Sequence, residues 1–153
     1  MFMKTILITI SLLFAITSCA KKDSETKLSE NNEGESKKFI TSGYNGTILT
    51  SSDGTPWTSR TSGTSNHLWE ITYANNTFVV VGQSGTILTS SDGTIWTSRT
   101  SGTSNSLYGI TYGNSTFVAV GYSGTILTSS DGISWTSKTS GTSKGLYGIT
   151  YVE

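Results

Sequence analysis

The chain has 153 residues, of which 34% are apolar and only 13% are charged, and its formal net charge is zero. With no basic excess to attract phosphates, a nucleic-acid partner is not expected. One cysteine and one histidine exclude an internal disulfide framework, a cysteine-cluster metal site and a multi-histidine zinc site, and we expect neither a metal nor a cofactor.

Residues 1–18 have the pattern of a bacterial export signal. Lys4 supplies the positive start, and residues 6–16 form an apolar run too short to span a ~30 Å hydrocarbon core as a helix. The run ends in Ile-Thr-Ser-Cys, which resembles the lipobox of bacterial lipoproteins. The resemblance implies that Cys19 is lipidated and anchors the chain in a membrane of the cell envelope. Ala20 favours the outer over the inner membrane; an ordinary signal peptide with an incidental cysteine is the alternative.

Residues 19–38, which begin with the predicted lipidated Cys19, form a polar segment. Five lysines balance five acidic residues there, and Leu28 is the only larger apolar side chain. Such a composition buries too little apolar surface to offset the conformational entropy of an ordered chain. The sequence therefore predicts a disordered tether that spaces the following domain from the lipid.

Residues 39–153 contain a 39-residue repeat. Positions 82–112 and 121–151 are identical at 25 of 31 places. The middle copy predicts four strands, at 68–73, 77–81, 86–90 and 96–100, with Trp69, Ile71 and Tyr73 on one face and with both glycines of the 82–85 turn at positive φ. A period near 40 with glycine and aromatic punctuation is typical of propeller blades, so we expect an all-β, propeller-like array of about three four-stranded blades.

A Ser-x-Asp-Gly-x-x-Trp hairpin follows the third strand of each copy. It resembles the Asp-box, or bacterial neuraminidase (BNR) repeat, shortened by one residue between Asp and Gly, and the wider repeat is similar to the photosystem II assembly-factor-like group of Asp-box propellers. The resemblance implies a structural hairpin in which the carboxylate accepts amide hydrogen bonds and the tryptophan covers the turn. Calcium ligation or acid catalysis is the alternative, although no second carboxylate lies nearby in sequence. The matching residues are Ser51, Asp53, Gly54 and Trp57, then Ser90, Asp92, Gly93 and Trp96, then Ser129, Asp131, Gly132 and Trp135.

The sequence predicts no catalytic residues and no enzyme activity. A sialidase needs three converging arginines, but only Arg60 and Arg99 are present, and Lys138 holds the third equivalent position on the outermost strand. Glu70 is the only glutamate inside the repeats before the last residue, which leaves no carboxylate pair for ordinary glycoside hydrolysis. A triad built on His67 is not favoured, because the other copies carry serine and glycine at that position.

One face of the array is the candidate binding surface, because turns between second and third strands share it with the crossings between copies. Its aromatic and amide groups suit an unknown protein or glycan ligand; solvated turn residues are the alternative. Trp69, Tyr108 and Tyr147 share one position on the innermost strand, where they either pack between blades, as we expect, or line a central channel. The candidate binding residues are Tyr44, Asn66, His67, Gln83, Asn105, Tyr122 and Lys144.

With strands labelled a to d from the axis outward, residues 39–153 have the order bcd-abcd-abcd-a. Closed propellers have about four to eight blades, so three blades indicate either half of an oligomeric ring built by strand exchange or a shortened, degenerate propeller. The overall prediction is a non-catalytic envelope lipoprotein whose module serves protein assembly, adhesion or glycan binding. A photosystem-assembly-factor-like chaperone and a sialidase-like glycosidase are the alternative functions.

Overall fold

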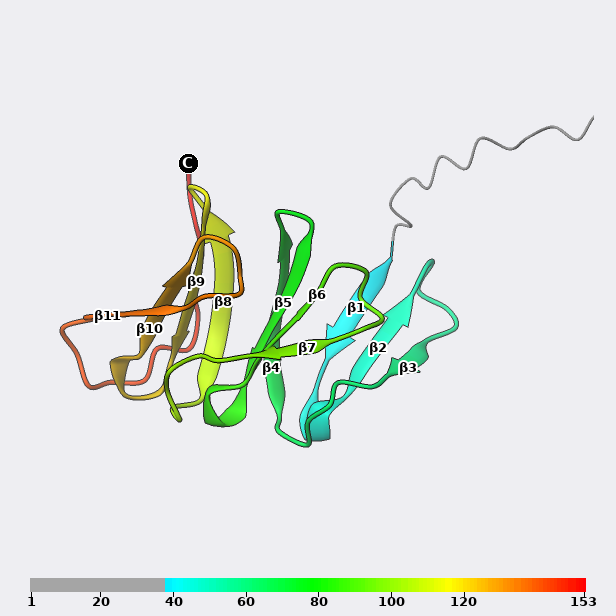
Figure 1. The fold of residues 1–153 in the computed structure, drawn as a ribbon, viewed down its shortest axis with the longest axis horizontal. Coiled ribbons are helices and arrows are strands. Elements are labelled where there is room, and N and C mark those ends of the chain that lie inside the picture. The colour runs from blue at the N-terminus through cyan, green and yellow to red at the C-terminus, as the bar shows by residue number, and fades with distance from the viewer. Residues whose placement is uncertain (1–37) are drawn as a thin grey trace, which may run out of the picture. The chain divides into compact units, whose positions relative to one another are not determined.

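The computed structural model describes residues 38–153, so the predicted signal peptide, Cys19 and all of the predicted tether except Lys38 lie outside the described residues. The described part contains three antiparallel sheets and no α-helix (Figure 1). Blade 1 consists of β1 (Phe39–Ser42), β2 (Ile48–Ser51) and β3 (Thr58–Arg60). Blade 2 consists of β4 (Leu68–Ala74), β5 (Thr77–Gly82), β6 (Ile87–Ser90) and β7 (Thr97–Arg99). Blade 3 consists of β8 (Leu107–Gly113), β9 (Thr116–Gly121), β10 (Ile126–Ser129) and β11 (Thr136–Lys138).

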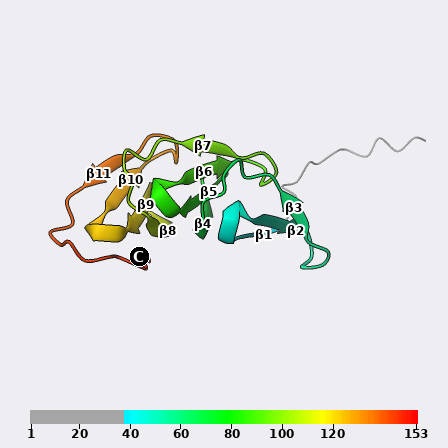
Figure 2. The same ribbon diagram turned by 90° about the horizontal axis from the view of Figure 1, so that it is seen from below.

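Each strand pairs with the strand that follows it in the same blade, because the connecting turns are short. The three blades stand side by side as an open fan, with β4 and β8 on the inner side and β3, β7 and β11 on the outer side (Figures 1 and 2). The sheets do not close into a ring. This arrangement confirms the expected all-β, propeller-like array.

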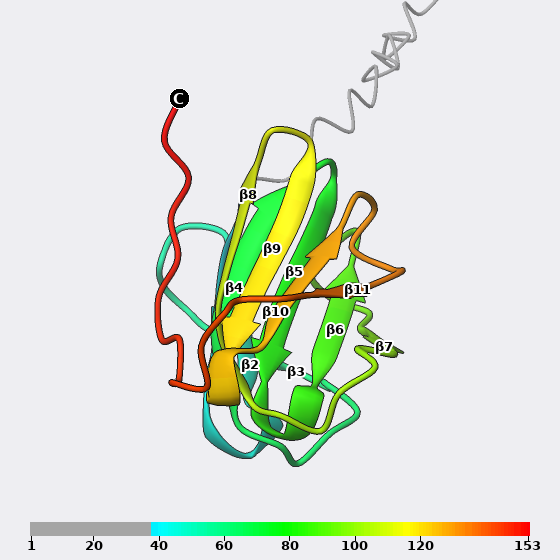
Figure 3. The ribbon, with the colours of Figure 1, turned by 90° about the vertical axis from the view of Figure 1, so that its left-hand side faces the viewer.

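The strands of blade 2 confirm the four expected in the middle copy, each boundary falling within one residue of its predicted place. The expected strand at 146–151 does not form, since no neighbouring strand in the described chain pairs with it. The segment nevertheless follows β8 along its length (Figure 3). The amide of Leu146 donates to the carbonyl of Gly121 at 2.9 Å, just as the amide of Leu68 donates to that of Gly43 at 3.0 Å.

The turn between second and third strands is a short 3-10 turn in every blade: Tyr44–Gly46, Gln83–Gly85 and Tyr122–Gly124. In blade 2, Gly85 takes the expected positive φ of 71°, but Gly82 is extended and Ser84 takes the left-handed conformation instead. The need for glycine at position 82 is therefore steric. A Cβ there would lie 2.2 Å from the carbonyl oxygen of His67 on the adjacent strand.

A β-bulge alters the alternation of side chains at the start of each innermost strand. The register shifts between Leu68 and Glu70 in β4, and between Leu107 and Gly109 in β8. Since a bulge adds one residue, Leu68 and Ile71 contact the same apolar cluster although they are an odd number of residues apart.

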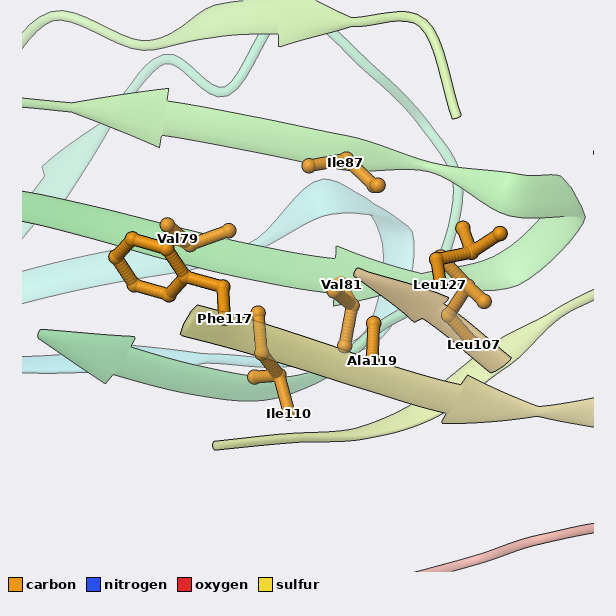
Figure 4. Packing of buried hydrophobic residues seen from close by; sticks show 8 residues of the cluster. All are labelled: Val79, Val81, Ile87, Leu107, Ile110, Phe117, Ala119 and Leu127. Carbon is orange, nitrogen blue, oxygen red and sulfur yellow. The ribbon is translucent and has the colours of Figure 1, made fainter. Parts of the chain in front are cut away.

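The apolar core lies between blades. The first inter-blade core, between blades 1 and 2, contains Ile48, Leu68, Val80 and Leu88, with Ile40, Ile71 and Trp96 packed against it. The second inter-blade core, between blades 2 and 3, contains eight buried side chains that point toward one another from the facing sheets (Figure 4). They are Val79, Val81, Ile87, Leu107, Ile110, Phe117, Ala119 and Leu127.

Candidate functional site

The three Asp turns, residues 51–57, 90–96 and 129–135, share a network of hydrogen bonds that is complete in the second and third turns. In the second turn, Asp92 Oδ1 accepts from the amides of Thr94 at 2.8 Å and Ile95 at 3.1 Å. Ser90 Oγ donates to the same carboxylate at 3.0 Å and accepts from the amide of Gly93 at 2.8 Å. The aspartate and serine thus satisfy the polar groups of the turn from within.

The third turn repeats this pattern, and the first departs from it for a chemical reason. Asp131 Oδ1 accepts from the amides of Ile133 at 2.8 Å and Ser134 at 2.9 Å. Asp53 Oδ1 accepts from the amide of Thr55 at 2.8 Å, but the next residue is Pro56, which has no N–H to donate.

Hydrogen bonds to the ionised carboxylate lower the pKa of two of these aspartates. The side chain of Thr94, followed by the amides of Thr94 and Ile95, holds the pKa of Asp92 far below its usual value. The amides of Ser134 and Ile133 lower the pKa of Asp131 in the same way. Both carboxylates are therefore ionised acceptors at neutral pH, and neither has a proton to give as an acid.

The glycines of two Asp turns lie against the preceding blade. A Cβ on Gly93 would lie 2.3 Å from Cδ1 of Ile40 in β1, and one on Gly132 would lie 3.1 Å from Cγ2 of Val79 in β5. At the corresponding position in the first turn, a Cβ on Gly54 would have nothing within 4 Å among the described residues. The contacts of the second and third turns are thus contacts between blades.

Part of the candidate binding surface is an aromatic cluster of Tyr44, His67 and Trp69. The ring centroids lie 4.6 Å apart for Tyr44 and His67, 5.5 Å for Tyr44 and Trp69, and 5.4 Å for His67 and Trp69, and every pair meets edge to face. His67 Nδ1 accepts from the amide of Asn45 at 3.1 Å, which fixes the imidazole between the other two rings.

The aromatic cluster is open to solvent. Tyr44 is 66% exposed and Trp69 is 38% exposed. Tyr44 comes from the turn of blade 1, whereas His67 and Trp69 come from the crossing into blade 2 and from β4. Trp69 was not among the predicted binding residues; the sequence indicated it only as a residue of the innermost strand that packs between blades or lines a channel.

The other candidate binding residues lie outside the aromatic cluster, and three of them make hydrogen bonds within the repeats. Asn66 Nδ2 donates to Thr86 Oγ1, and Asn105 Nδ2 donates to Thr125 Oγ1, each at 2.9 Å, so both amides tie a crossing to the next turn. Gln83 Oε1 accepts from the amide of His67 at 3.3 Å. Tyr122 is 56% exposed and Lys144 is exposed.

The repeat position of Trp69 makes ring contacts between neighbouring repeats. Tyr108, at the same position in β8, stacks on Tyr147 with ring centroids 5.0 Å apart. Trp69 reaches back to Tyr44 of blade 1. Trp69 and Tyr147 are nevertheless 38% and 73% exposed, so neither is the buried packing residue that the sequence led us to expect.

The basic residues considered for a sialidase site lie on the outermost strands. Arg60 is in β3, Arg99 in β7 and Lys138 in β11. Both arginines donate from Nε at 2.8 Å to a threonine hydroxyl of the adjacent strand, Thr50 for Arg60 and Thr89 for Arg99. Each is thereby held within its own blade.

Two further features concern residues 38–153. No group of three or more His, Cys, Asp or Glu side chains in this range could hold a metal ion. A shallow hollow of about 520 Å³ lies between the crossings at 102–105 and 139–142, and serine, threonine and glycine make up most of its lining.

The described part of the chain has no helix with the length and apolar character needed to cross a membrane.

Comparison with known proteins identifies the fold. No protein-family model and no curated protein matches the chain. Among solved structures it is similar to "YCF48 bound to D1 peptide", with a TM-score of 0.57 and 21% sequence identity, over 67% of this chain and 36% of that one. The chain thus spans little more than a third of that neighbour, which is a β-propeller. At this identity the similarity shows the fold alone: the described residues form an open, propeller-like array of three blades.

Proposed function

We propose that this chain is a non-catalytic binding module of the bacterial envelope, which takes an extended segment of a partner protein at the aromatic cluster of Tyr44, His67 and Trp69. The observation that carries the proposal is the exposure of Tyr44 and Trp69, whose rings contact each other and His67 at a junction between blades. Exposed tyrosine and tryptophan are the side chains most enriched where proteins bind one another. The similar solved structure was determined with a bound peptide, which supports a peptide over other ligands.

The geometry of the rings also favours a peptide over a sugar. A sugar ring stacks on an open aromatic face, whereas these three rings meet edge to face at 73° to 84° and cover parts of one another. The turn that carries Tyr44 and the crossing that carries His67 also contribute backbone amide and carbonyl groups beside these rings. Such a surface suits a chain that brings its own backbone donors and acceptors.

A peptide array of diverse extended sequences, probed with the full chain beside a glycan array, tests this function. Trp69→Ala should abolish the peptide signal, because it removes the largest ring of the aromatic cluster. The matched control is Tyr122→Ala, which removes a tyrosine that is 56% exposed, against 66% for Tyr44, from the same repeat position, where no ring contact is formed among the described residues. Equal binding by both variants, or Trp69-dependent binding to glycans only, would contradict the proposal.

The envelope location rests on Cys19, at the end of the lipobox-like segment. We propose that acyl chains on Cys19 hold the module at the membrane, with the outer membrane favoured by Ala20. Mass spectrometry of the protein from membranes should find the acyl groups, and Cys19→Ser should release the chain into the soluble fraction. An unmodified Cys19 in a membrane-bound chain would contradict this anchor.

A further inference from the structure

Blade 1 has an open position at its inner edge. In blades 2 and 3, the second strands β5 and β9 pair on that edge with β4 and β8, over the length of the strand. The corresponding strand of blade 1 is β1, and among residues 38–153 its only strand partner is β2. Blade 1 therefore lacks its innermost strand within the described chain.

The glycine at position 43 is the residue that a neighbouring innermost strand would require. The equivalent glycines, Gly82 and Gly121, would place a Cβ 2.2 Å and 2.1 Å from the carbonyl oxygens of His67 and Ser106 on the innermost strand. At Gly43 the nearest atom is Cβ of Thr47 at 3.8 Å, and its φ of −169° is one that any residue adopts. Nothing in the described chain explains a glycine here, but an incoming carbonyl would.

The amide that follows this glycine gives the same indication. The amide of Gln83 donates to His67 O, and that of Tyr122 donates to Ser106 O, both at 2.8 Å. The equivalent amide of Tyr44 has no such acceptor among the described residues. A carbonyl placed beside Gly43 would complete the repeat pattern of hydrogen bonds.

The segment 146–151 has the sequence that this position requires. It reads Leu-Tyr-Gly-Ile-Thr-Tyr, identical to residues 107–112 of β8. It already lies where the innermost strand of a fourth blade would lie: Leu146 bonds to Gly121, and Tyr147 stacks on Tyr108. No strand of the described residues pairs with the segment (Figure 3). Tyr147 is 73% exposed.

The face of blade 1 that is turned away from blade 2 is open in the same way. Trp57 is 44% exposed and Phe39 is 58% exposed, whereas Phe117, at the repeat position of Phe39, is fully buried. A Cβ on Gly54 would meet nothing within 4 Å in residues 38–153, although Gly93 and Gly132 pack on the preceding blade. A preceding blade would cover these residues.

We propose that two copies of this chain close a six-bladed ring, in which segment 146–151 of each copy pairs with β1 of the other. The register follows from blades 2 and 3: Leu146 lies opposite Gly43, Ile149 opposite Thr41, and Tyr151 opposite Phe39. Gly145 O then accepts from the amide of Tyr44 in the other copy.

One copy cannot fill its own open position. Blade 1 and segment 146–151 lie at opposite ends of the fan (Figures 1 and 2). A closed propeller has about four to eight blades, so three are too few and six are within the range. The two open faces differ from each other, and a head-to-tail contact between unlike faces makes a ring when its rotation closes.

The ring would also add a residue to the aromatic cluster. Tyr147 of the second copy would lie beside Trp69, because Tyr147 in the present chain lies beside Tyr108 at the same repeat position. The pairing itself does not depend on what the aromatic cluster binds.

The first test is the solution mass of the full chain in mild detergent, by light scattering behind a sizing column. We expect the mass of two chains. Gly43→Ala should raise the dimer dissociation constant by about ten- to 100-fold, because its Cβ overlaps the incoming carbonyl. It should leave the fold of each chain intact, and Ser98→Ala on the outermost strand β7 is the control that stays dimeric. A monomeric wild type, a ladder of larger assemblies, or an unaffected Gly43→Ala dimer would overturn the proposal.

Engineered cysteines test the register directly, in a Cys19→Ser background. The pair Thr41→Cys and Ile149→Cys places two thiols opposite each other across the proposed strand pair. Mild oxidation should therefore yield a covalent dimer. The matched pair Thr41→Cys and Thr150→Cys is shifted by one residue, so its second thiol points to the other face of the strand and should not cross-link. Equal cross-linking by both pairs, or by neither, would refute the pairing.

Discussion

The tryptophans of the second and third Asp turns share a repeat position but differ in one hydrogen bond. Trp135 Nε1 donates to the carbonyl of Gly132 at 3.0 Å. Trp96 Nε1 is buried and has no partner within the described residues. Since a buried donor without a partner costs free energy, the two indoles contribute to stability in different ways although both pack on the apolar core.

This difference predicts unequal effects of the same substitution. Trp135→Phe should lower the free energy of unfolding by about 1 kcal/mol more than Trp96→Phe, because only the former loses a hydrogen bond. Urea unfolding of the two variants, compared with the wild type, measures the difference. Equal losses would mean that the bond at Trp135 adds nothing to stability.

The two lowered aspartate pKa values predict a dependence of stability on pH. The pKa values of Asp92 and Asp131 in the folded chain lie below the ordinary aspartate value of 3.8. As the pH falls, these two carboxylates are therefore protonated in the unfolded chain before they are protonated in the folded chain. The stabilisation that they provide is present above the ordinary aspartate pKa and is lost as the pH falls below it. The double variant Asp92→Asn, Asp131→Asn should lose stability at pH 7 and depend less on pH below 4 than the wild type.

Urea midpoints of the two proteins between pH 7 and pH 2.5 measure this effect. Both carboxylates are exposed, so a moderate salt concentration should be held constant throughout. Parallel curves for wild type and double variant would contradict the assignment of the stabilising bonds to these carboxylates.

At the scale of single elements, close contact between adjacent strands determines where glycine is needed. Gly82 ends β5 in an extended conformation, and the carbonyl of His67 lies where its Cβ would be. Gly82→Ala should therefore push β4 away from β5 and lower the free energy of unfolding by about 2–4 kcal/mol. Gly43→Ala is the matched control when all proteins are measured at a concentration low enough to keep the chain monomeric, since its Cβ meets only ordinary contacts within one chain. Thermal unfolding of both variants tests this contrast. Equal melting temperatures would contradict the steric explanation of Gly82.

The strands of blade 2 could be predicted from sequence because alternation and glycine-marked turns are local signals. The bulges in β4 and β8 could not, since a one-residue shift in register depends on the partner strand. Ser84 takes the left-handed conformation that the sequence assigned to glycine, because the 3-10 turn needs it at its central residue. The segment 146–151 has the residues of a strand and lacks only a neighbour.

The candidate site shows the same limit. The histidine and Tyr44 were predicted to share a face, and they do come together. Trp69 completes the aromatic cluster because a turn of blade 1 meets a strand of blade 2. A contact between blades has no signature within one repeat, so a single sequence does not reveal it.

At the scale of the whole molecule, the stability of the array comes from the contacts between blades. Every buried apolar residue of the second inter-blade core belongs to blade 2 or blade 3, and the two sets face each other (Figure 4). In an array of this kind, the stability is the sum of repeat and interface contributions between neighbours. Removing a side chain from an interface should therefore uncouple two blades rather than loosen one sheet.

Phe117 and Phe39 occupy the same repeat position and provide the test. Phe117 is fully buried, and Phe117→Ala should lower the free energy of unfolding by about 3–5 kcal/mol through lost burial and the cavity left behind. Phe39 is 58% exposed, so Phe39→Ala should change the free energy of unfolding little. This variant is measured in the Gly43→Ala background, which keeps a second copy from covering Phe39. Urea unfolding followed by tryptophan fluorescence in both variants gives the comparison. If Phe39→Ala were as damaging as Phe117→Ala, stability would reside within each sheet, and the core between blades would not be what holds the array together.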